Sequence, residues 1–201
     1  MRNGFTKKIV GTALFAALSF VVSLLEFPIF PAAGFLKLDF SAVFILLGGF
    51  MYGPIAGIII CAVKELIRFV MGSGTGGIGE IANFLVTTSF IIVPTVVYRF
   101  RTGIKTVLIT MAAGIVLQVG VALLSNRFIM FPLYMGNGAA DAFNSLWHFV
   151  ALFNLIKGAA ISVIVFLLYK RVSWLFIKIK LQSARKSDII ENDEDGERDS
   201  E

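Results

Sequence analysis

Five long apolar runs dominate the chain. They cover residues 9–27, 40–63, 81–98, 104–125 and 148–169, and short polar breaks separate them. Only 15% of the residues are charged, whereas soluble domains carry about 25%. A run of about 20 apolar residues is long enough to cross a bilayer as a helix. We therefore predict an all-α, multi-pass integral protein of the cell membrane.

The second run contains a turn signal that divides it. The stretch "LLGGFMYGPIAG" holds Gly48, Gly49, Gly53 and Pro54, and glycine–proline clusters of this kind break helices. Two short helices, about 39–52 and 54–71, raise the count from five to six. Six spans place the basic residues near the N-terminus, at 99–105 and after 169 on one side, as the positive-inside rule requires. We predict a bundle of six transmembrane helices with both termini cytoplasmic.

The charge distribution predicts one membrane domain and a separate tail. Net charge is +5, yet eight of the thirteen acidic residues follow Lys186. Residues 1–180 are predicted to form the membrane domain, and residues 181–201 an acidic, disordered cytoplasmic tail. The basic residues cluster at helix ends, so they indicate membrane topology rather than nucleic-acid binding. The outer loops are then 28–39, 72–79 and 126–147, which we expect to cover an outward-facing pocket.

The last apolar run carries Asn154 and Lys157 near its middle. On a helix these positions share one face, and a charge at bilayer depth is functional by default. Other polar residues of the outer half could complete a pocket with this pair. They are Lys37, Asp39, Glu80, Asn83, Gln118 and Asn126. Amides and one deep lysine among apolar residues predict a site for a flat, largely uncharged molecule.

Structural roles compete with this interpretation. Lys157 could pair with Glu80 or with a backbone carbonyl, and Glu80 could be a first-turn acid favoured by the helix dipole. Lys64, Glu65 and Arg68 are expected to form local ion pairs near the interface. The stretch "GSGTGGIG" lacks the Lys-Ser/Thr of a P-loop, so we expect a mobile lid there rather than a phosphate site.

The sequence shows no catalytic constellation. His148 is the single histidine and Cys61 the single cysteine, which excludes a histidine-rich metal site and a disulfide within one chain. An intramembrane serine protease is the enzymatic alternative. However, Ser73 lies in "VMGSG" within a loop, and His148 lies at the outer edge of its helix. We predict no enzyme, no catalytic residues, no bound metal and no cofactor.

Three segments carry a family resemblance. They are "GFLKLDFSAVFILLGGFMYGPIAG", "GGIGEIANF" and "FNLIKG", and their order and topology together are specific. Over residues of about 5–180 the chain resembles the S components of energy-coupling factor (ECF) vitamin transporters, most closely the riboflavin-specific members. The resemblance implies a subunit that captures riboflavin outside the cell as its transported ligand. Delivery inward would require a transmembrane scaffold subunit and two ATPase subunits.

The resemblance also implies roles for individual residues. Asn154 and Lys157 would hydrogen-bond the polar edge of the isoalloxazine ring, and loop 35–39 would cover the ring. The full predicted substrate set is Asn154, Lys157, Asn126, Glu80, Asn83, Leu38, Asp39 and Lys37. Ala13 and Ala17, small residues four apart, would let the scaffold helix approach closely. Two transport alternatives stay open: an S component for another vitamin, and a stand-alone secondary carrier, for which inverted repeats would be expected.

Overall fold

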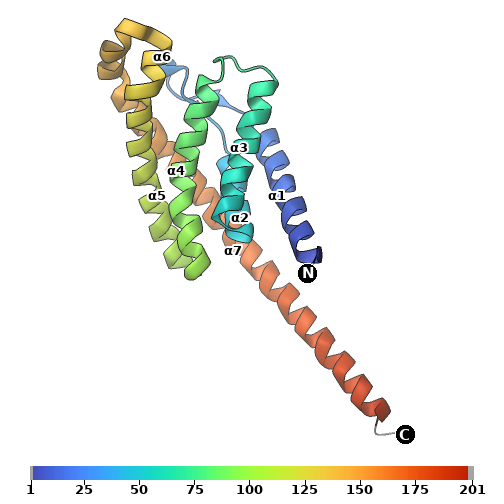
Figure 1. Cartoon of the computed structure of the whole chain (residues 1–201). Coiled ribbons are helices and arrows are strands. Elements are labelled where there is room, and N and C mark those ends of the chain that lie inside the picture. The colour runs from blue at the N-terminus through green and yellow to red at the C-terminus, as the bar shows by residue number, and fades with distance from the viewer. Residues whose placement is uncertain (1, 199–201) are drawn as a thin grey trace. The chain divides into compact units, whose positions relative to one another are not determined.

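The structure, a computed structural model, is almost entirely helical (Figure 1). It describes the backbone of residues 2–198 and the side chains of residues 5–168. The elements in chain order are α1 (Arg2–Ser23), β1 (Phe27–Pro28), η1 (Pro31–Ala33), β2 (Lys37–Leu38), α2 (Ala42–Tyr52), α3 (Pro54–Val70), α4 (Ile78–Phe100), α5 (Ile104–Ser125), η2 (Asn126–Met130), α6 (Phe131–Met135), η3 (Gly136–Gly138) and α7 (Ala139–Arg198).

The chain divides into two compact units, residues 1–165 and 166–201. The side-chain contacts described below all lie within the first unit. The side chains of residues 181–201 lie outside the described part, so the acidic, disordered tail and the boundary at residue 180 stay predictions.

The surface of the first unit is that of a membrane protein. Three helical stretches are long and apolar enough to cross a bilayer: Phe5–Ser23, Ile78–Phe100 and Ile104–Leu168, with Ala42–Tyr52 a shorter apolar helix. α3 is amphipathic, but its polar face is buried and its apolar face is exposed, the reverse of a helix in a soluble protein. Lys64 and Glu65 are buried, while Ile55 and Leu66 are exposed. Polar groups that face inward and aliphatic groups that face outward suit lipid rather than water.

The predicted break in the second apolar run is confirmed. Gly53 has φ +98°, a left-handed conformation that glycine adopts without strain. Pro54 follows as the first residue of α3, where its missing N–H is not needed. Gly49 lies within α2 instead, and a Cβ there would lie 2.5 Å from Thr95 of α4. This glycine therefore serves close packing between α2 and α4.

The expectation that residues 126–147 form a loop is wrong. This stretch is mainly helical, with a π-turn at η2, the short helix α6, and α7 beginning at Ala139. Pro132 lies in the first turn of α6, a position that proline favours. Gly136, at φ +54°, ends α6, so the glycine- and proline-containing sequence marks a tight helical connection.

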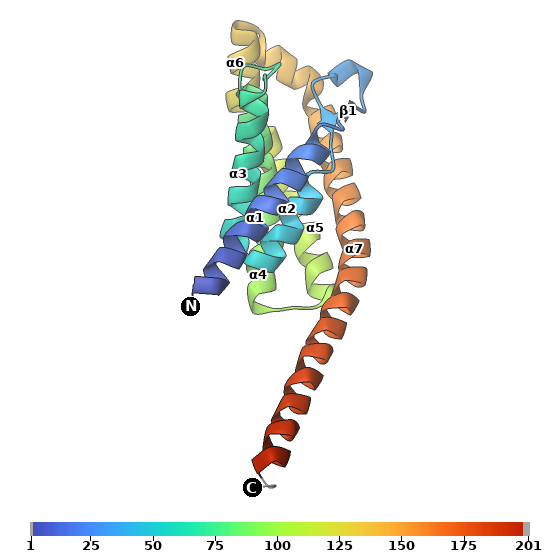
Figure 2. The same cartoon turned by 90° about the vertical axis from the view of Figure 1, so that its right-hand side faces the viewer.

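Three connections gather at one end of the bundle (Figures 1 and 2). They are loop 1 (residues 24–41), the glycine-rich loop 71–77, and the segment 126–138. Within loop 1, β1 and β2 form a two-stranded antiparallel ladder that pairs Phe27 with Leu38. Leu36 and Leu38 pack with Ala122 of α5 and with Val150 and Phe153 of α7 in one buried apolar cluster. Loop 1 thus folds onto α5 and α7 at this end.

Candidate substrate-binding site

α7 directs Asn154 and Lys157 into the protein. Their relative exposures are 4% and 5%, and their i, i+3 spacing places them on one face. The Lys157 ammonium donates to Asp39 Oδ2 at 2.8 Å. Its partner is therefore an acid of loop 1, not Glu80 or a backbone carbonyl.

Asp39 belongs to a larger buried charge network, defined here as Asp39, Lys64, Glu65 and Lys157. Asp39 Oδ1 accepts hydrogen bonds from the backbone N–H of Ser41, at 2.9 Å, and from the Ser41 hydroxyl. The i to i+2 backbone contact is an Asx turn, a local preference of aspartate.

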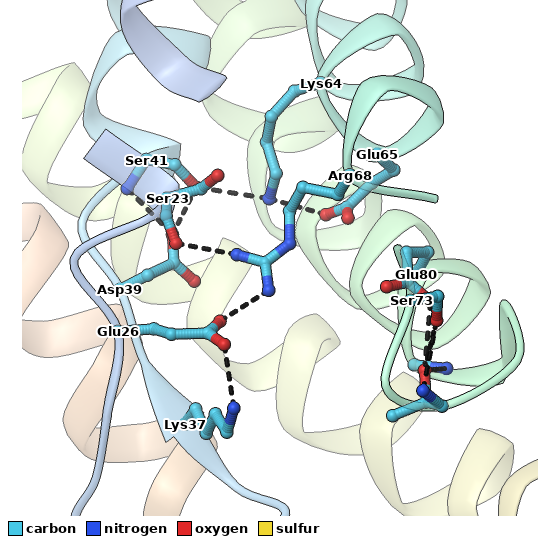
Figure 3. Close-up of polar contacts among 12 residues, drawn as sticks. Ser23, Glu26, Lys37, Asp39, Ser41, Lys64, Glu65, Arg68, Ser73 and Glu80 are labelled. Carbon is cyan, nitrogen blue, oxygen red and sulfur yellow. Dashed lines mark hydrogen bonds and ion pairs between the residues drawn. The ribbon is translucent and has the colours of Figure 1, made fainter. Parts of the chain in front are cut away.

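Lys64 extends this network to α3 (Figure 3). Its ammonium donates to the Ser41 hydroxyl at 3.2 Å and lies 2.5 Å from Glu65 Oε1. The local ion pair predicted for Lys64 and Glu65 is present, although it is fully buried rather than interfacial. With two cations and two carboxylates, the network carries no net formal charge, which limits the penalty for burying it.

Asn154 is held by two protein groups. Its Nδ2 donates to the Val150 carbonyl at 2.9 Å, and its Oδ1 accepts from Gln118 Nε2 of α5 at 3.2 Å. Gln118 is 2% exposed. The sequence marked it as a polar residue of the outer half but did not place it in the predicted substrate set. Its signal was a lone amide within an apolar helix.

Loop 1 covers this polar cluster with apolar side chains. Leu38 is buried in the apolar cluster that also contains Val150 and Phe153. Phe35 is half exposed and meets Phe131 of α6 edge-to-face, with ring centroids 5.9 Å apart. The base of the loop is also fixed to α1, because the Ser19 hydroxyl donates to the Ser41 carbonyl at 3.2 Å.

Lys37 lies away from the charge network despite its position beside Leu38. Its ammonium is 2.8 Å from Glu26 Oε1, and Arg68 Nη2 donates to Glu26 Oε2 at 2.7 Å (Figure 3). Arg68 thus pairs with loop 1 rather than with its α3 neighbours. Burial raises the pKa of Glu26, but Lys37 and Arg68 oppose this and hold that pKa below its ordinary value.

The Glu80 carboxylate accepts hydrogen bonds from the glycine-rich loop. Its Oε2 accepts from the hydroxyls of Ser73, at 2.7 Å, and Thr75, at 3.0 Å. Figure 3 shows this group separate from the Asp39 network. Asn83 is half-buried one turn further along α4.

Asn126 is buried in η2, where its Nδ2 donates to the Ala122 carbonyl at 2.8 Å. The structure therefore brings Asp39, Asn154 and Lys157 together with Gln118. It leaves Lys37 and Glu80 in separate contacts. Among the described side chains, no three His, Cys, Asp or Glu residues could hold a metal ion.

A second feature is an apolar groove of about 600 Å³ between α1 and α3. Ala13, Ala16 and Ala17 line its α1 side, and Ala56, Ile59 and Val63 lie among the residues of its α3 side. Its lining is mostly apolar, unlike the buried polar cluster. It contains both alanines that the sequence singled out.

Comparison with known proteins places this geometry in a family. Residues 7–169 match the family described as "ECF transporter, substrate-specific component". The chain is 33% identical to the riboflavin transporter RibU of Staphylococcus aureus (strain TCH60), over 83% of this chain and 90% of that protein. It is 28% identical to the riboflavin transporter FmnP of Bacillus subtilis (strain 168), over 87% and 92% respectively.

A solved structure agrees with these relatives. It is described as "Structure and mechanism of the S component of a bacterial ECF transporter" and matches with a TM-score of 0.76 at 31% identity. The match covers 85% of this chain and 98% of that one. The inward-facing polar cluster, the apolar exterior and these matches lead to one conclusion: the chain belongs to the substrate-specific components of ECF transporters.

Proposed function

We propose that this chain binds riboflavin from outside the cell and passes it inward. The observation that carries the proposal is the buried polar cluster that Asp39 of loop 1 forms with Gln118, Asn154 and Lys157. It lies in a bundle whose relatives bear the name riboflavin transporter. Because its charge network has no net formal charge, the site suits a neutral amphipathic ligand better than an anion.

The chemistry of the cluster matches the polar edge of a flavin. An ammonium has three N–H donors, and Asp39 occupies one from Lys157, so two remain for ring carbonyls. Asn154 retains one N–H and one lone pair beside its contacts to Val150 and Gln118. Phe35, Leu38 and Phe153 supply apolar surface for the flat ring.

Six membrane spans with both termini cytoplasmic give the topology that this function needs. The spans would be α1 to α5 and the part of α7 within residues 139–168. Loop 1, loop 71–77 and segment 126–138 then face outward, and the basic residues near 99–105 face the cytoplasm. The 11 residues of α2 extend only ~16 Å, so neighbouring helices would shelter its ends.

Transport would depend on partner proteins. A transmembrane scaffold subunit is proposed to dock on the α1–α3 groove, where Ala13 and Ala17 permit close approach of another helix. Two ATPase subunits would supply the energy. Riboflavin is the transported ligand in this scheme and not a cofactor.

Ligand binding by the purified protein tests the proposal. Riboflavin fluorescence should be quenched as detergent-solubilised protein is added, and a preparation that retains ligand should be yellow. Lys157→Met should weaken binding about tenfold or more, because ring carbonyls lose a charged donor (~1.5–3 kcal/mol). Lys105→Met, which removes an exposed lysine in the first turn of α5, should leave affinity unchanged.

The result that overturns the riboflavin assignment is equally clear. Colourless protein that leaves riboflavin fluorescence unquenched, yet binds another vitamin, would identify an S component of different specificity. Equal affinity in the wild type and Lys157→Met would move the ligand away from the charge network. Uptake by the chain alone, without partner subunits, would favour a secondary carrier.

A further inference from the structure

A hydrogen bond between Gln118 and Asn154 joins α5 to α7. Among the described residues it is the one side-chain hydrogen bond between these two helices. The Gln118 amide N–H donates to Asn154 Oδ1 at 3.2 Å, and both side chains are almost fully buried. An amide can present either its oxygen or its nitrogen to a neighbour. The direction of this contact therefore needs a cause.

The Val150 carbonyl fixes that direction. A backbone carbonyl can only accept, so the group of Asn154 that faces it must be the NH₂, as observed at 2.9 Å. Asn154 Oδ1 then faces α5. Gln118 must therefore donate to Asn154 Oδ1 with its own NH₂, because two amide oxygens facing each other would leave buried acceptors unpaired.

Gly158 makes room for the Gln118 side chain. It lies one turn after Asn154 on α7, and a Cβ at this position would lie 3.0 Å from Gln118 Oε1 and 2.8 Å from Ile115 Cγ1. The absence of a side chain at Gly158 therefore lets the Gln118 amide approach α7 closely. Gln118 Oε1 is buried without a hydrogen-bond partner among the described residues. The contact of Gln118 with Asn154 is therefore made by Nε2.

The polar chain from Val150 through Asn154 to Gln118 leaves a defined face on Asn154. One N–H and one lone pair of that amide remain, on the face of α7 that also carries Lys157. An asparagine amide held in this way can form two hydrogen bonds to a ligand edge that has an acceptor beside a donor. Asparagine binds adenine in the same manner. The imide edge of a flavin, an N–H between two carbonyls, has that pattern.

We infer that Gln118, seated against Gly158, is a positioning residue that locks the Asn154 amide in the orientation that recognises an unsubstituted cyclic imide. The inference rests on the proposed flavin-binding function and adds to it the origin of selectivity for the imide N–H. Gln118 acts through Asn154 and need not touch the ligand. Its removal should therefore change discrimination between ligands more than overall folding.

Two ligands separate these effects: riboflavin, and its analogue methylated on the imide nitrogen. The wild type should bind riboflavin about tenfold more tightly than the analogue, the worth of one buried hydrogen bond. Gln118→Leu replaces the amide with an apolar side chain and leaves the Asn154 amide held by the Val150 carbonyl alone, so that its plane can tilt. It should lose most of the affinity for riboflavin and little for the analogue, so the preference collapses towards one.

Gly158→Ala provides an independent variant, because its methyl group displaces the Gln118 amide without removing it. It should reduce the same preference. Gly120→Ala, on α5 where no atom lies within 4 Å of the added Cβ, should keep the full preference. Thermal unfolding of each purified variant identifies any that fail to fold.

The outcomes distinguish this inference from the function on which it rests. Riboflavin binding by the wild type, with an unchanged preference in both Gln118→Leu and folded Gly158→Ala, would overturn the positioning role and leave the function intact. Equal losses for both ligands would show a merely structural role. A wild type that binds neither flavin would overturn the proposed function and this inference with it.

Discussion

Lys157 of α7 and Asp39 of loop 1, which lie 118 positions apart in the sequence, form a buried ion pair of 2.8 Å. The pair joins the helix that carries the candidate ligand groups to the loop that covers them. Displacement of Asp39 with loop 1 would break the pair in a low-dielectric environment. Under the proposed function, entry of the substrate past loop 1 would break the same ion pair that helps to hold the bundle closed.

Removal of one partner should be more harmful than removal of both. Asp39→Asn leaves the Lys157 ammonium buried beside a neutral amide, and we expect a loss of ~3–5 kcal/mol in the free energy of unfolding. The double variant Asp39→Asn/Lys157→Met should recover much of this loss, because no unpaired charge remains. Denaturant unfolding of the purified proteins in detergent measures the cycle. Strictly additive effects would mean that the pair contributes no coupling.

The ion pairs of Glu26 in loop 1 should respond to acid. The pKa of Glu26 is held below the ordinary 4.5 by Lys37 and Arg68. Ionised Glu26 therefore adds stability that is fully present above about pH 4.5 and is lost as the pH falls through the lowered value. Glu26→Gln should be less stable than the wild type by ~1 kcal/mol at neutral pH, and the difference should vanish in acid.

Thermal unfolding at several pH values measures this difference. Asp141→Asn is the matched control, because Asp141 is exposed and forms no ion pair within the described residues. Its stability should differ little from that of the wild type throughout. A gap for Glu26→Gln that grows as the pH falls would contradict the assigned contacts.

Local sequence rules predicted the helices and the break between α2 and α3. Apolar runs of bilayer length and the pair Gly53–Pro54 are signals that act within a few residues. The same rules failed for residues 126–147, which were assigned to a loop because they lie between two apolar runs, although Pro132 and Gly136 are part of this stretch. Both residues are compatible with short helical turns, and only packing against neighbouring segments decides between the two.

The candidate site shows the same division between local and long-range information. The face shared by Asn154 and Lys157 follows from helical spacing alone. Their partners, Gln118 and Asp39, come from segments distant in the sequence. The spacing of residues along the chain does not predict such long-range pairs. Lys37 and Asp39 lie two apart in sequence yet make different contacts, because loop 1 directs one to Glu26 and the other to α7. The binding roles themselves stay predictions until ligand is measured.

Close packing of α4 and α5 gives a sharp test at Gly114. Pro94 has no N–H to offer the Phe90 carbonyl four residues earlier, and a Cβ at Gly114 would lie 2.5 Å from that oxygen. Gly114→Ala should force the helices apart and lower stability by ~1–3 kcal/mol.

Gly120→Ala is the matched change on the same helix, in open space. It should stabilise the protein slightly, by ~0.5–1 kcal/mol, because alanine favours the helix. The melting temperatures of the two variants in one detergent give the comparison. Equal effects of the two substitutions would contradict the observed approach of α5 to the Phe90 carbonyl.

The proposed docking of the scaffold subunit on α1 and α3 separates transport from binding. Ala13→Trp or Ala17→Trp fills the groove between these helices and should abolish riboflavin uptake in cells that contain all transporter subunits. The same variants, purified, should bind riboflavin as the wild type does, because the groove is separate from the buried polar cluster. Leu14→Trp places an indole on an exposed position of α1 outside the groove lining and should transport normally. Normal uptake by both alanine variants would remove the groove from the docking surface, whereas loss of uptake by Leu14→Trp would extend that surface across α1.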